Sequence, residues 1–567
     1  MLDAVSLMAH AHVDPIRRVL QLVRTEGRDL WVVLTYAAGI GLVSLAVPIA
    51  VASLVNTVAF GTVLQQVFVL TFFVLVGLSF EGVMATMQFL VVELLQRRVF
   101  VRVALDLAHL LPRVRSDAHD SNDIPELVNR FFDVVTVQKT GASLLLEGLA
   151  LALQAIIGTL LLAFYHPALL AFDAVLVLGI LLILFPLGRG AIPTSLEESK
   201  GKYAVAAWLE ELGRNPQTFR PEAARAYAVE RTEGLTRGYL SARAMHFRIV
   251  MRQQIGSRAL KAILSAALLG LGGWLVSERK LSVGQLAAAE LIVSSVVTGV
   301  AKFSKQLDAW YDLVTAVDKL GHLVELPTDR SDGAPLPATD RRPLGLEFVD
   351  VEYRYEDDPP TVQGVHLQVA PGARVAVVGG SSSGKSTLAA LAVGLRAPTR
   401  GVVRVDGADM RELSLDAMHR DTALIHRPEV FNGSVYDNVA VGRTDVSADD
   451  VRSALRRAGL EGSVAALGEG VQTRLQVGGR PFSSAQSWRL MFARAIARRP
   501  RLLVIDGALD GLDDEIVHEV LPALLDRRAP WTLLVFTHRA ELARRCDVTF
   551  DLRDGAVPSP PLPTGDR

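Results

Sequence analysis

RVAVVGGSSSGKST, residues 374–387, is the stretch of sequence that decides the fold of the second half of this chain. Its first five residues form an apolar run typical of a buried strand, and the rest match the pattern G-x-x-x-x-G-K-[ST]. An apolar helix is expected next, over residues 388–395. Strand, glycine-rich turn and helix in this order predict a phosphate-binding loop in an α/β domain, because backbone N–H groups and the helix N-terminus face the phosphates.

The loop supplies most of the candidate nucleotide-binding residues. We expect Lys385 to reach the β- and γ-phosphates and the Ser386 hydroxyl to bind Mg²⁺. The remaining loop residues, expected to surround the phosphates, are Gly379, Gly380, Ser381, Ser382, Ser383, Gly384 and Thr387.

Two later apolar runs end in polar residues that suit the same site. Leu502–Asp506 reads as a strand that ends in a carboxylate, which can hold Mg²⁺ through water. Residues 533–538 read as a strand that ends in His538, a candidate contact for the γ-phosphate. Either pattern is common by itself, and their order after the phosphate loop in one α/β domain makes them informative.

The first half of the chain has a different composition. Hydrophobic residues make up 50% of the 567 residues, and residues 30–80 contain no Asp, Glu, Lys or Arg. A helix needs about 20 apolar residues to cross a membrane. Residues 30–80 are long enough for one span and most of a second, and the further apolar runs are 143–165, 168–187, 255–276 and 283–300. We therefore predict a helical domain with six transmembrane spans.

Basic residues predict the orientation of these spans. Arginines precede residue 30, and Lys and Arg are frequent in the long loops 97–139 and 189–252, whereas 56–66 has none. The positive-inside rule places both termini and both long loops in the cytoplasm. The short loop with Arg279 and Lys280 departs mildly from this pattern. Turns near 116–122 and 215–221 would then be available to touch a cytoplasmic partner, although a solvated loop is the alternative.

These observations predict four parts. Residues 1–326 form the transmembrane domain, and the Pro-, Asp- and Arg-rich residues 327–343 form a linker. Residues 344–556 form the α/β nucleotide-binding domain, and residues 557–567 form a disordered tail. The single cysteine, Cys546, excludes an intrachain disulfide. The net charge of −1 names no partner, and no basic stripe with interleaved aromatic residues supports nucleic-acid binding.

The order of motifs resembles the nucleotide-binding domain of ABC transporters, so the nucleotide is expected to be ATP with Mg²⁺. The resemblance implies that Tyr355, rather than Tyr353, stacks on adenine, that Asp506 is the Walker B carboxylate and that His538 is the switch histidine. It places His426 in the Q-loop, Asp513 in the D-loop, and Ser483, Ser484, Ala485 and Gln486 in the signature motif. The apolar half resembles the six-helix membrane domain of ABC exporters, most closely those of the haemolysin and bacteriocin kind.

The sequence departs from this family at the residues of hydrolysis. Gly507 stands where the family has a Glu that positions or deprotonates the attacking water, and losing a general base typically slows a reaction by about 10²–10⁴. His426 replaces the Q-loop glutamine, and both signature glycines are replaced, by Ser484 and Ala485. Ser382 replaces a glycine of the phosphate loop, which is a milder change.

The resemblance implies an exporter subunit in the inner (cytoplasmic) membrane that moves a peptide, a protein or another amphipathic substrate. It would bind ATP but hydrolyse it weakly or with a partner's help. Membrane lipid, a twin or a second ABC half-transporter, and a membrane-fusion adaptor are the implied partners. The alternative is a non-hydrolysing, ATP-gated regulator or scaffold of a secretion complex. An importer ATPase is disfavoured, because importers usually carry the membrane domain on a separate chain.

Overall fold

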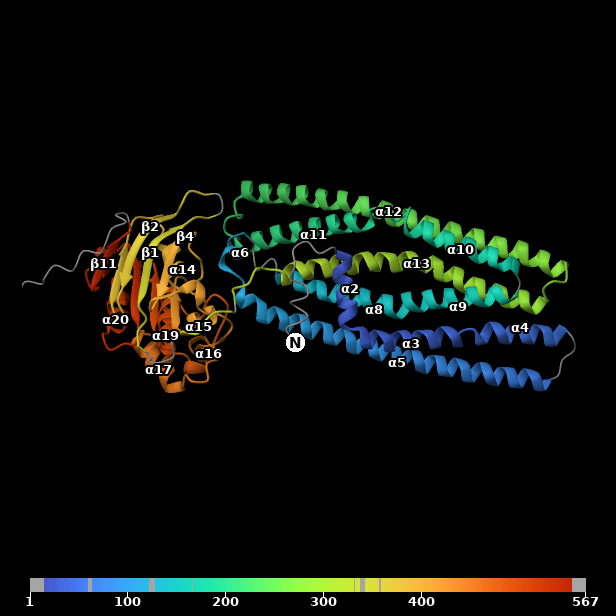
Figure 1. Cartoon of the computed structure of the whole chain (residues 1–567), viewed down its shortest axis with the longest axis horizontal. Helices are drawn as coiled ribbons and strands as arrows, with labels where there is room; N and C mark the ends of the chain where they lie inside the picture. The colour runs from blue at the N-terminus through green and yellow to red at the C-terminus, as the bar shows by residue number, and fades with distance from the viewer. Residues whose placement is uncertain are drawn as a thin grey trace, which may run out of the picture. The chain divides into compact units, whose positions relative to one another are not determined.

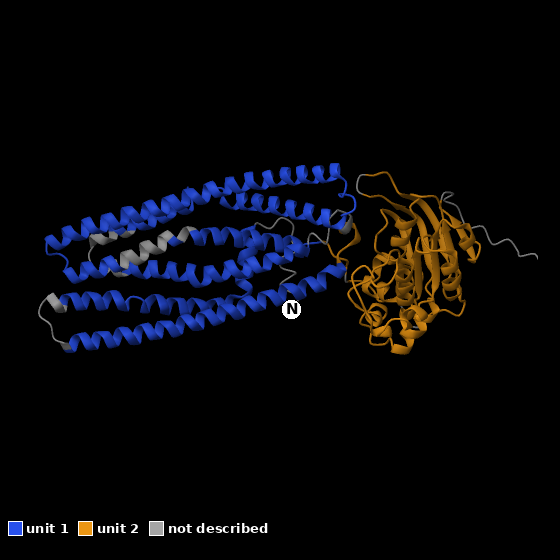
Figure 2. Cartoon of the chain, turned by 180° about the vertical axis from the view of Figure 1, so that it is seen from behind, with its two compact units in different colours: residues 1–113, 122–326 blue, residues 114–121, 327–567 orange. Residues whose placement is uncertain are grey.

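The computed structural model describes residues 15–59, 64–121, 128–165, 167–330, 332–336, 342–355 and 358–552. The chain divides into two compact units, coloured separately in Figure 2. Unit 1 comprises residues 1–113 and 122–326, and unit 2 comprises residues 114–121 and 327–567. The main division therefore follows Leu326, while the short segment Val114–Ser121 belongs to unit 2. The predicted tail, residues 557–567, lies outside the described residues.

Unit 1 is built from helices, several of which lie side by side in Figure 1. Helix α13 packs on α4, α8, α9 and α12, and α12 also packs on α10 and α11. The described helices of unit 1 are α2 (Pro15–Thr25), α3 (Gly27–Val43), α4 (Ala46–Ala59), α5 (Leu64–Leu110), α8 (Asp133–Ser143), the π-helix η3 (Leu144–Gly148), α9 (Leu149–Tyr165), α10 (Pro167–Leu184), α11 (Ala191–Arg214), α12 (Glu222–Ser277) and α13 (Val283–Val324), with 3-10 turns at Leu111–Arg113 and Arg130–Phe132. The predicted helical character of this half is confirmed.

Over the described residues, most of each apolar run of the first half lies in helix. Among the described residues, four helices are long and apolar enough to cross a membrane, namely Gly27–Asn56, Gln65–Arg113, Arg130–Leu160 and Glu222–Ser277. The fourth and sixth runs correspond to α10 and to the first part of α13. Helix α12 has 56 residues, so at 1.5 Å per residue it is about 84 Å long, well beyond a hydrocarbon core of about 30 Å. Helix α12 is therefore long enough to extend well past a bilayer, and its extension into the cytoplasm stays a prediction.

The surface of unit 1 is apolar along α5. Phe68, Phe72, Phe73 and Leu75 are each more than 60% exposed. Water-soluble monomers rarely expose contiguous apolar patches of this kind. These side chains suit contact with lipid tails, whereas the buried side chains of unit 1 include Leu264 and Leu268, which are fully enclosed.

Unit 2 contains the predicted α/β domain, and that fold is confirmed. A five-stranded parallel sheet has the order β11-β3-β10-β9-β6, and a four-stranded antiparallel sheet has the order β2-β1-β4-β5. The strands are β1 (Leu346–Tyr353), β2 (Val362–Val369), β3 (Arg374–Val378), β4 (Arg400–Val405), β5 (Ala408–Asp409), β6 (Thr422–Ile425), β7 (Gly433–Ser434), β8 (Arg474–Leu475), β9 (Leu502–Asp506), β10 (Thr532–Thr537) and β11 (Val548–Asp551). Strands β3 and β9 have the predicted bounds.

Helices cover the sheets of unit 2 and complete two hydrophobic cores. One core gathers around Phe492 and Trp531, and the other gathers around Phe348 and Phe536. The described helices are α6 (Ser116–Ser121), α14 (Lys385–Ala392), α15 (Leu415–Asp421), α16 (Val435–Ala440), α17 (Ala448–Arg457), α18 (Glu461–Ala465), α19 (Ser484–Arg498), α20 (Asp514–Leu525) and α21 (Ala540–Ala543), with 3-10 turns at Met410–Glu412 and Gly470–Gln472. Helix α14 begins three residues before the predicted helix.

The segment Val114–Ser121 joins unit 2 through the backbone. Val114 forms an antiparallel bridge with Thr328, and the Arg115 N–H donates to the carbonyl of Pro327 at 2.9 Å. The turn predicted near residues 116–122 is the short helix α6 over its described residues. The segment that contains α6 is therefore joined to the start of the predicted linker, within unit 2.

Candidate nucleotide site

The parallel sheet brings the motif residues to one edge. Val378 pairs with Thr537, Asp506 pairs with Phe536, and Ile425 pairs with Ile505. Parallel strands end on the same side, so the residues that follow β3, β6, β9 and β10 emerge together. Ligands of open α/β sheets bind at this carboxyl edge.

The phosphate loop has the backbone that its glycines allow. Gly384 has φ +89°, and a Cβ there would lie 2.7 Å from the carbonyl oxygen of Thr361. Ser382 also has a positive φ, +63°. L-residues are strained in this region by roughly 1–2 kcal/mol. Because glycine adopts a left-handed backbone without strain, it would fit position 382 better than serine does.

Lys385 lies over the loop that it is predicted to serve. Its ammonium donates to the carbonyl oxygens of Gly379 at 3.0 Å and Gly380 at 2.6 Å. Helix α14 begins at Lys385, so the positive end of the helix dipole lies at the same loop as the ammonium. This arrangement suits an anion with several oxygens, such as a polyphosphate.

Asp506 ends β9 beside the start of α14. The Ser386 hydroxyl hydrogen bonds to the Asp506 carboxylate, and burial raises the pKa of that carboxyl above its ordinary value. Mg²⁺ prefers oxygen ligands and usually joins one or two carboxylates to substrate phosphates. A carboxylate and a hydroxyl that already meet at the phosphate loop fit this ion. The residues present therefore suit Mg²⁺ at Ser386 and Asp506.

His426 follows β6 and lies next to Asp506 across the sheet edge. Burial is the main influence on its imidazole and lowers its pKa, although Glu429 and Asp506 oppose the shift. The His426 Nε2 atom lies 4.0 Å from a Glu429 carboxylate oxygen. Position 426 thus offers a neutral imidazole, which can donate one hydrogen bond and accept another.

Gly507 follows Asp506 with a left-handed backbone, φ +64°. A Cβ built there would meet no atom within 4 Å. Its N–H donates to the carbonyl of Phe536, and its carbonyl accepts from the N–H of Asp510, both at 3.0 Å. A side chain would have open space at this position, but it would strain the backbone.

Asp510 and His538 form a close pair in the same site. The His538 Nδ1 atom lies 2.8 Å from a carboxylate oxygen of Asp510, and the His538 backbone N–H donates to that oxygen at 3.1 Å. The Thr537 hydroxyl donates to the other oxygen. The Asp510 side chain is 10% exposed and the His538 side chain is 65% exposed. The pair therefore presents an oriented imidazole to solvent from a largely enclosed carboxylate.

The candidate adenine residue Tyr355 is held from two sides. Its hydroxyl hydrogen bonds to the Thr387 hydroxyl at 3.0 Å, which ties it to the phosphate-loop helix. Tyr353 packs edge-on against it, with ring centroids 5.0 Å apart. The Arg396 guanidinium lies 4.7 Å from the Tyr355 ring centroid and donates to the Tyr353 hydroxyl at 2.9 Å.

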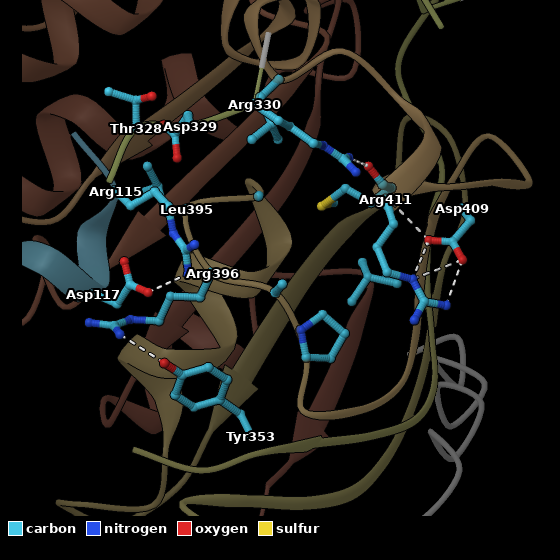
Figure 3. A pocket seen from close by; sticks show the side chains of 16 residues that line it. Arg115, Asp117, Thr328, Asp329, Arg330, Tyr353, Leu395, Arg396, Asp409 and Arg411 are labelled. Carbon is cyan, nitrogen blue, oxygen red and sulfur yellow. Dashed lines mark hydrogen bonds and ion pairs between the residues drawn. The ribbon is translucent and has the colours of Figure 1, made fainter. Parts of the chain in front are cut away.

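Arg396 and Tyr353 also line a cavity of about 390 Å³ within unit 2. Figure 3 shows Arg396 directed at the Tyr353 hydroxyl, with Arg115 and Asp117 close by. Arg115 and Asp117 come from Val114–Ser121, the segment of the first half of the sequence that belongs to unit 2. The cavity thus lies between this segment and Tyr353, the neighbour of the candidate adenine residue.

The signature residues stand at the start of α19. Ser483 is its N-cap, where its hydroxyl accepts from the Gln486 N–H at 3.2 Å. The Gln486 side chain accepts from the Ser483 N–H at 2.9 Å, which completes a capping box. Ser484 and Ala485 occupy the first turn, and Asp513 caps α20 without a side-chain hydrogen bond. These residues therefore stand at the N-terminal ends of two helices, α19 and α20.

Sequence reasoning missed two contributors to the site. Asp510 is 28 residues from His538, and Arg396 is 43 residues from Tyr353. The position of Asp510 shortly after the Walker B strand is the one sequence signal for its contact with His538. The local sequence around Arg396 carries no motif that signals a contact with the tyrosines.

Comparison with known proteins gives a family match within unit 2. Residues 362–510 match the family described as ABC transporter. The chain is 31% identical over 301 residues to a multidrug efflux ATP-binding/permease protein of Mycobacterium tuberculosis, which is 53% of this chain and 25% of that protein. It is 30% identical over 322 residues to a cyclolysin secretion/processing ATP-binding protein of Bordetella pertussis, which is 56% of this chain and 45% of that protein.

A third relative is an alpha-hemolysin translocation ATP-binding protein of Proteus vulgaris, 27% identical over 326 residues. That match covers 56% of this chain and 45% of the relative. The chain thus spans between a quarter and a little under half the length of these three relatives.

The fold has a close counterpart among solved structures. A bacterial Atm1-family ABC exporter with ATP bound superposes with a TM-score of 0.82 at 18% sequence identity, covering 94% of both chains. The chain therefore has the fold of an ABC exporter, with an ABC transporter domain in its second half. Together with the four apolar helices, this fold is that of a multi-pass membrane protein.

Proposed function

We propose, from the premise that this chain joins the fold of an ABC exporter to an ABC transporter domain, that it is a subunit of an ATP-dependent exporter. It binds Mg-ATP and hydrolyses it slowly. The observation that carries the proposal is the contrast between two neighbouring positions. Lys385 donates a hydrogen bond to the phosphate loop and Ser386 hydrogen bonds to Asp506, an arrangement that suits phosphate and Mg²⁺. The next position after Asp506, residue 507, is a glycine.

The partners follow from the same premise. Exporters of this family work as dimers with two ATP molecules between the nucleotide-binding domains, so the chain pairs with a twin or with a more complete half-transporter. In a heterodimer, one ATP site lacks the Glu at position 507, and the other is closed by the altered signature of this chain. The proposed location is the inner membrane, with unit 2 in the cytoplasm.

The substrate is proposed as a peptide, a protein or another amphipathic molecule. The named relatives serve drug efflux and toxin secretion, which fits that class. If the substrate is a secreted protein, a membrane-fusion adaptor is a further partner. The second candidate function is that of a non-hydrolysing, ATP-gated regulator or scaffold of a secretion complex. Gly507 favours this function as well, because it lacks the carboxylate needed for hydrolysis.

The test measures ATP binding and ATP hydrolysis by the purified chain in lipid, beside Gly507→Glu and Gly507→Gln. Both variants carry the same left-handed strain of roughly 1–2 kcal/mol, so only the carboxylate distinguishes them. We expect the unmodified chain to bind ATP and turn it over slowly. Gly507→Glu should be faster by up to about 10²–10⁴, and Gly507→Gln should not be.

The exporter and the scaffold predict different results in this test. A chain that binds ATP with no turnover, and stays inactive as Gly507→Glu, would favour the scaffold. Absence of ATP binding would overturn both functions. Rapid turnover by the unmodified chain would contradict impaired hydrolysis and would mean that another group supplies the base.

A further inference from the structure

One guanidinium contacts both tyrosines of the candidate adenine site. The guanidinium carbon of Arg396 lies 4.7 Å from the centroid of the Tyr355 ring and 5.6 Å from that of the Tyr353 ring. The same group donates a hydrogen bond to the Tyr353 hydroxyl at 2.9 Å, which is the dashed line between these residues in Figure 3. Guanidinium groups stack on aromatic faces and are attracted to them within about 6 Å of the ring centroid. Arg396 is therefore placed to orient both rings.

The backbone holds the loop of Arg396 against the tyrosine segment. The Thr399 N–H donates to the carbonyl of Glu352 at 2.8 Å, and the Thr399 hydroxyl accepts from the N–H of Arg354 at 3.1 Å. These two bonds lie on either side of Tyr353 in the sequence. Helix α14, which begins in the phosphate loop, ends at Ala392, shortly before Arg396. The position of the guanidinium is thus fixed by the elements that also position the tyrosines and the phosphate loop.

Tyr355 connects this cluster with the phosphate loop. Its hydroxyl and the Thr387 hydroxyl are hydrogen bonded at 3.0 Å, and the Tyr353 ring meets its ring at an interplanar angle of 83°. An aromatic ring has two faces, so a guanidinium over one face leaves the opposite face for a stacked base. A ring that is already held in one orientation loses less side-chain freedom when the base binds.

We propose that Arg396 is a positioning residue of the adenine site. Its guanidinium lies over one face of the Tyr355 ring and holds the ring so that the opposite face receives adenine. The proposal rests on the proposed function, since it requires ATP in the phosphate loop. Arg396 then contributes to the binding of the base alone, and the triphosphate is bound without its help.

The experiment titrates the full chain in lipid with Mg-ATP and, separately, with Mg-tripolyphosphate, which has no base. Isothermal titration calorimetry measures both affinities. We expect Arg396→Ala to bind ATP about 3- to 10-fold more weakly and to bind tripolyphosphate as the unmodified chain does. Arg396→Lys should recover part of the ATP affinity, because an ammonium is also attracted to an aromatic face.

Arg400→Ala is the matched control for the loss of a cation. The Arg400 side chain is 73% exposed on β4, and its guanidinium lies 3.5 Å from an Asp350 carboxylate oxygen. Arg400→Ala should keep both affinities. The tripolyphosphate titration also shows whether each variant keeps a folded phosphate loop.

A double-mutant cycle tests whether Arg396 acts through Tyr355. Tyr355→Ala removes the ring that stacks on the base, and we expect it to weaken ATP binding by about 5- to 150-fold. Adding Arg396→Ala to this variant should weaken ATP binding no further, because the ring that the guanidinium positions is then absent. Two independent contributions would instead multiply.

Four results would overturn the proposal while the proposed function stands. The first is an unchanged ATP affinity in Arg396→Ala. The second is tighter ATP binding by this variant, which would mean that the guanidinium covers the face that adenine needs. The third is an equal loss of affinity for ATP and for tripolyphosphate, and the fourth is a pair of losses that multiply in the cycle. Absence of ATP binding by the unmodified chain would overturn the proposed function and this inference together.

Discussion

Single residues decide what this ATP site is able to do. Within residues 379–387, all of which the structure describes, Lys385 supplies the only ammonium. It donates hydrogen bonds to two loop carbonyls, and a bound phosphate would replace them as acceptors. Ser382 and Gly507 share a left-handed backbone, but only the glycine occupies it without strain. ATP binding and ATP hydrolysis are thus assigned to different positions of the chain.

Lys385→Ala should weaken ATP binding without disturbing the fold. A hydrogen bond to a charged group contributes about 1.5–3 kcal/mol, so we expect affinity to fall by roughly 10–100-fold. Titration of the purified chain with a fluorescent ATP analogue measures this. Arg404→Ala is the control, because it removes an exposed cation from β4, where Arg404 pairs with Glu347. Equal affinity in Lys385→Ala would show that the loop is not the nucleotide site.

The buried side chain of Arg18 links helix α2 to α13, beside the apolar contact of Val19 with Val314 and Val317. Arg18 is 1% exposed, and its guanidinium contacts Asp318 and Glu325, each at 2.7 Å. Those carboxylates are themselves largely buried. Burying an ion pair contributes little by itself, but removing one partner leaves uncompensated charge. The α2–α13 contact is therefore sensitive to a single substitution.

Arg18→Ala should destabilise unit 1 by about 3–5 kcal/mol, because both carboxylates would remain without their cation. The measurement is the unfolding midpoint of the detergent-solubilised chain. Arg24→Ala, an exposed arginine of the same helix, should change stability by less than about 0.5 kcal/mol. A similar midpoint for both variants would mean that packing rather than the ion pairs holds α2.

At the scale of the whole molecule, the start of α19 is the surface proposed to meet ATP on a partner subunit. Ser484 and Ala485 put side chains where the family has two glycines, so the partner's phosphates are held further from the backbone. The double variant Ser484→Gly, Ala485→Gly should let two nucleotide-binding domains close at a lower ATP concentration. Glycines in the first turn weaken the helix by up to about 1 kcal/mol each.

Closure can be followed as protection of the chain from limited proteolysis during an ATP titration. We expect half-protection at a several-fold lower ATP concentration in the double variant. Adding Lys385→Ala should move half-protection to a higher ATP concentration, since ATP would then bind more weakly. An unchanged titration would indicate that the signature side chains do not limit closure.

Much of the fold was predictable because it rests on local patterns. The run that ends at Val378 needed only apolar residues and glycines to identify strand β3 and its loop. The apolar runs of unit 1 were long enough to identify helices without knowing their neighbours. The site residues Lys385, Ser386, Asp506 and His538 follow strand ends, and parallel strands bring such ends together.

The sequence by itself determined the two-part architecture, the phosphate loop and the missing carboxylate at position 507. Only the tertiary structure decided that Asp510 holds His538, that Arg396 lies beside Tyr355, and that Arg18 reaches α13 across 300 residues of chain. The physical reason is that periodicity and glycine spacing act within one element. Contacts between distant side chains depend on how the elements pack, and no local pattern records that.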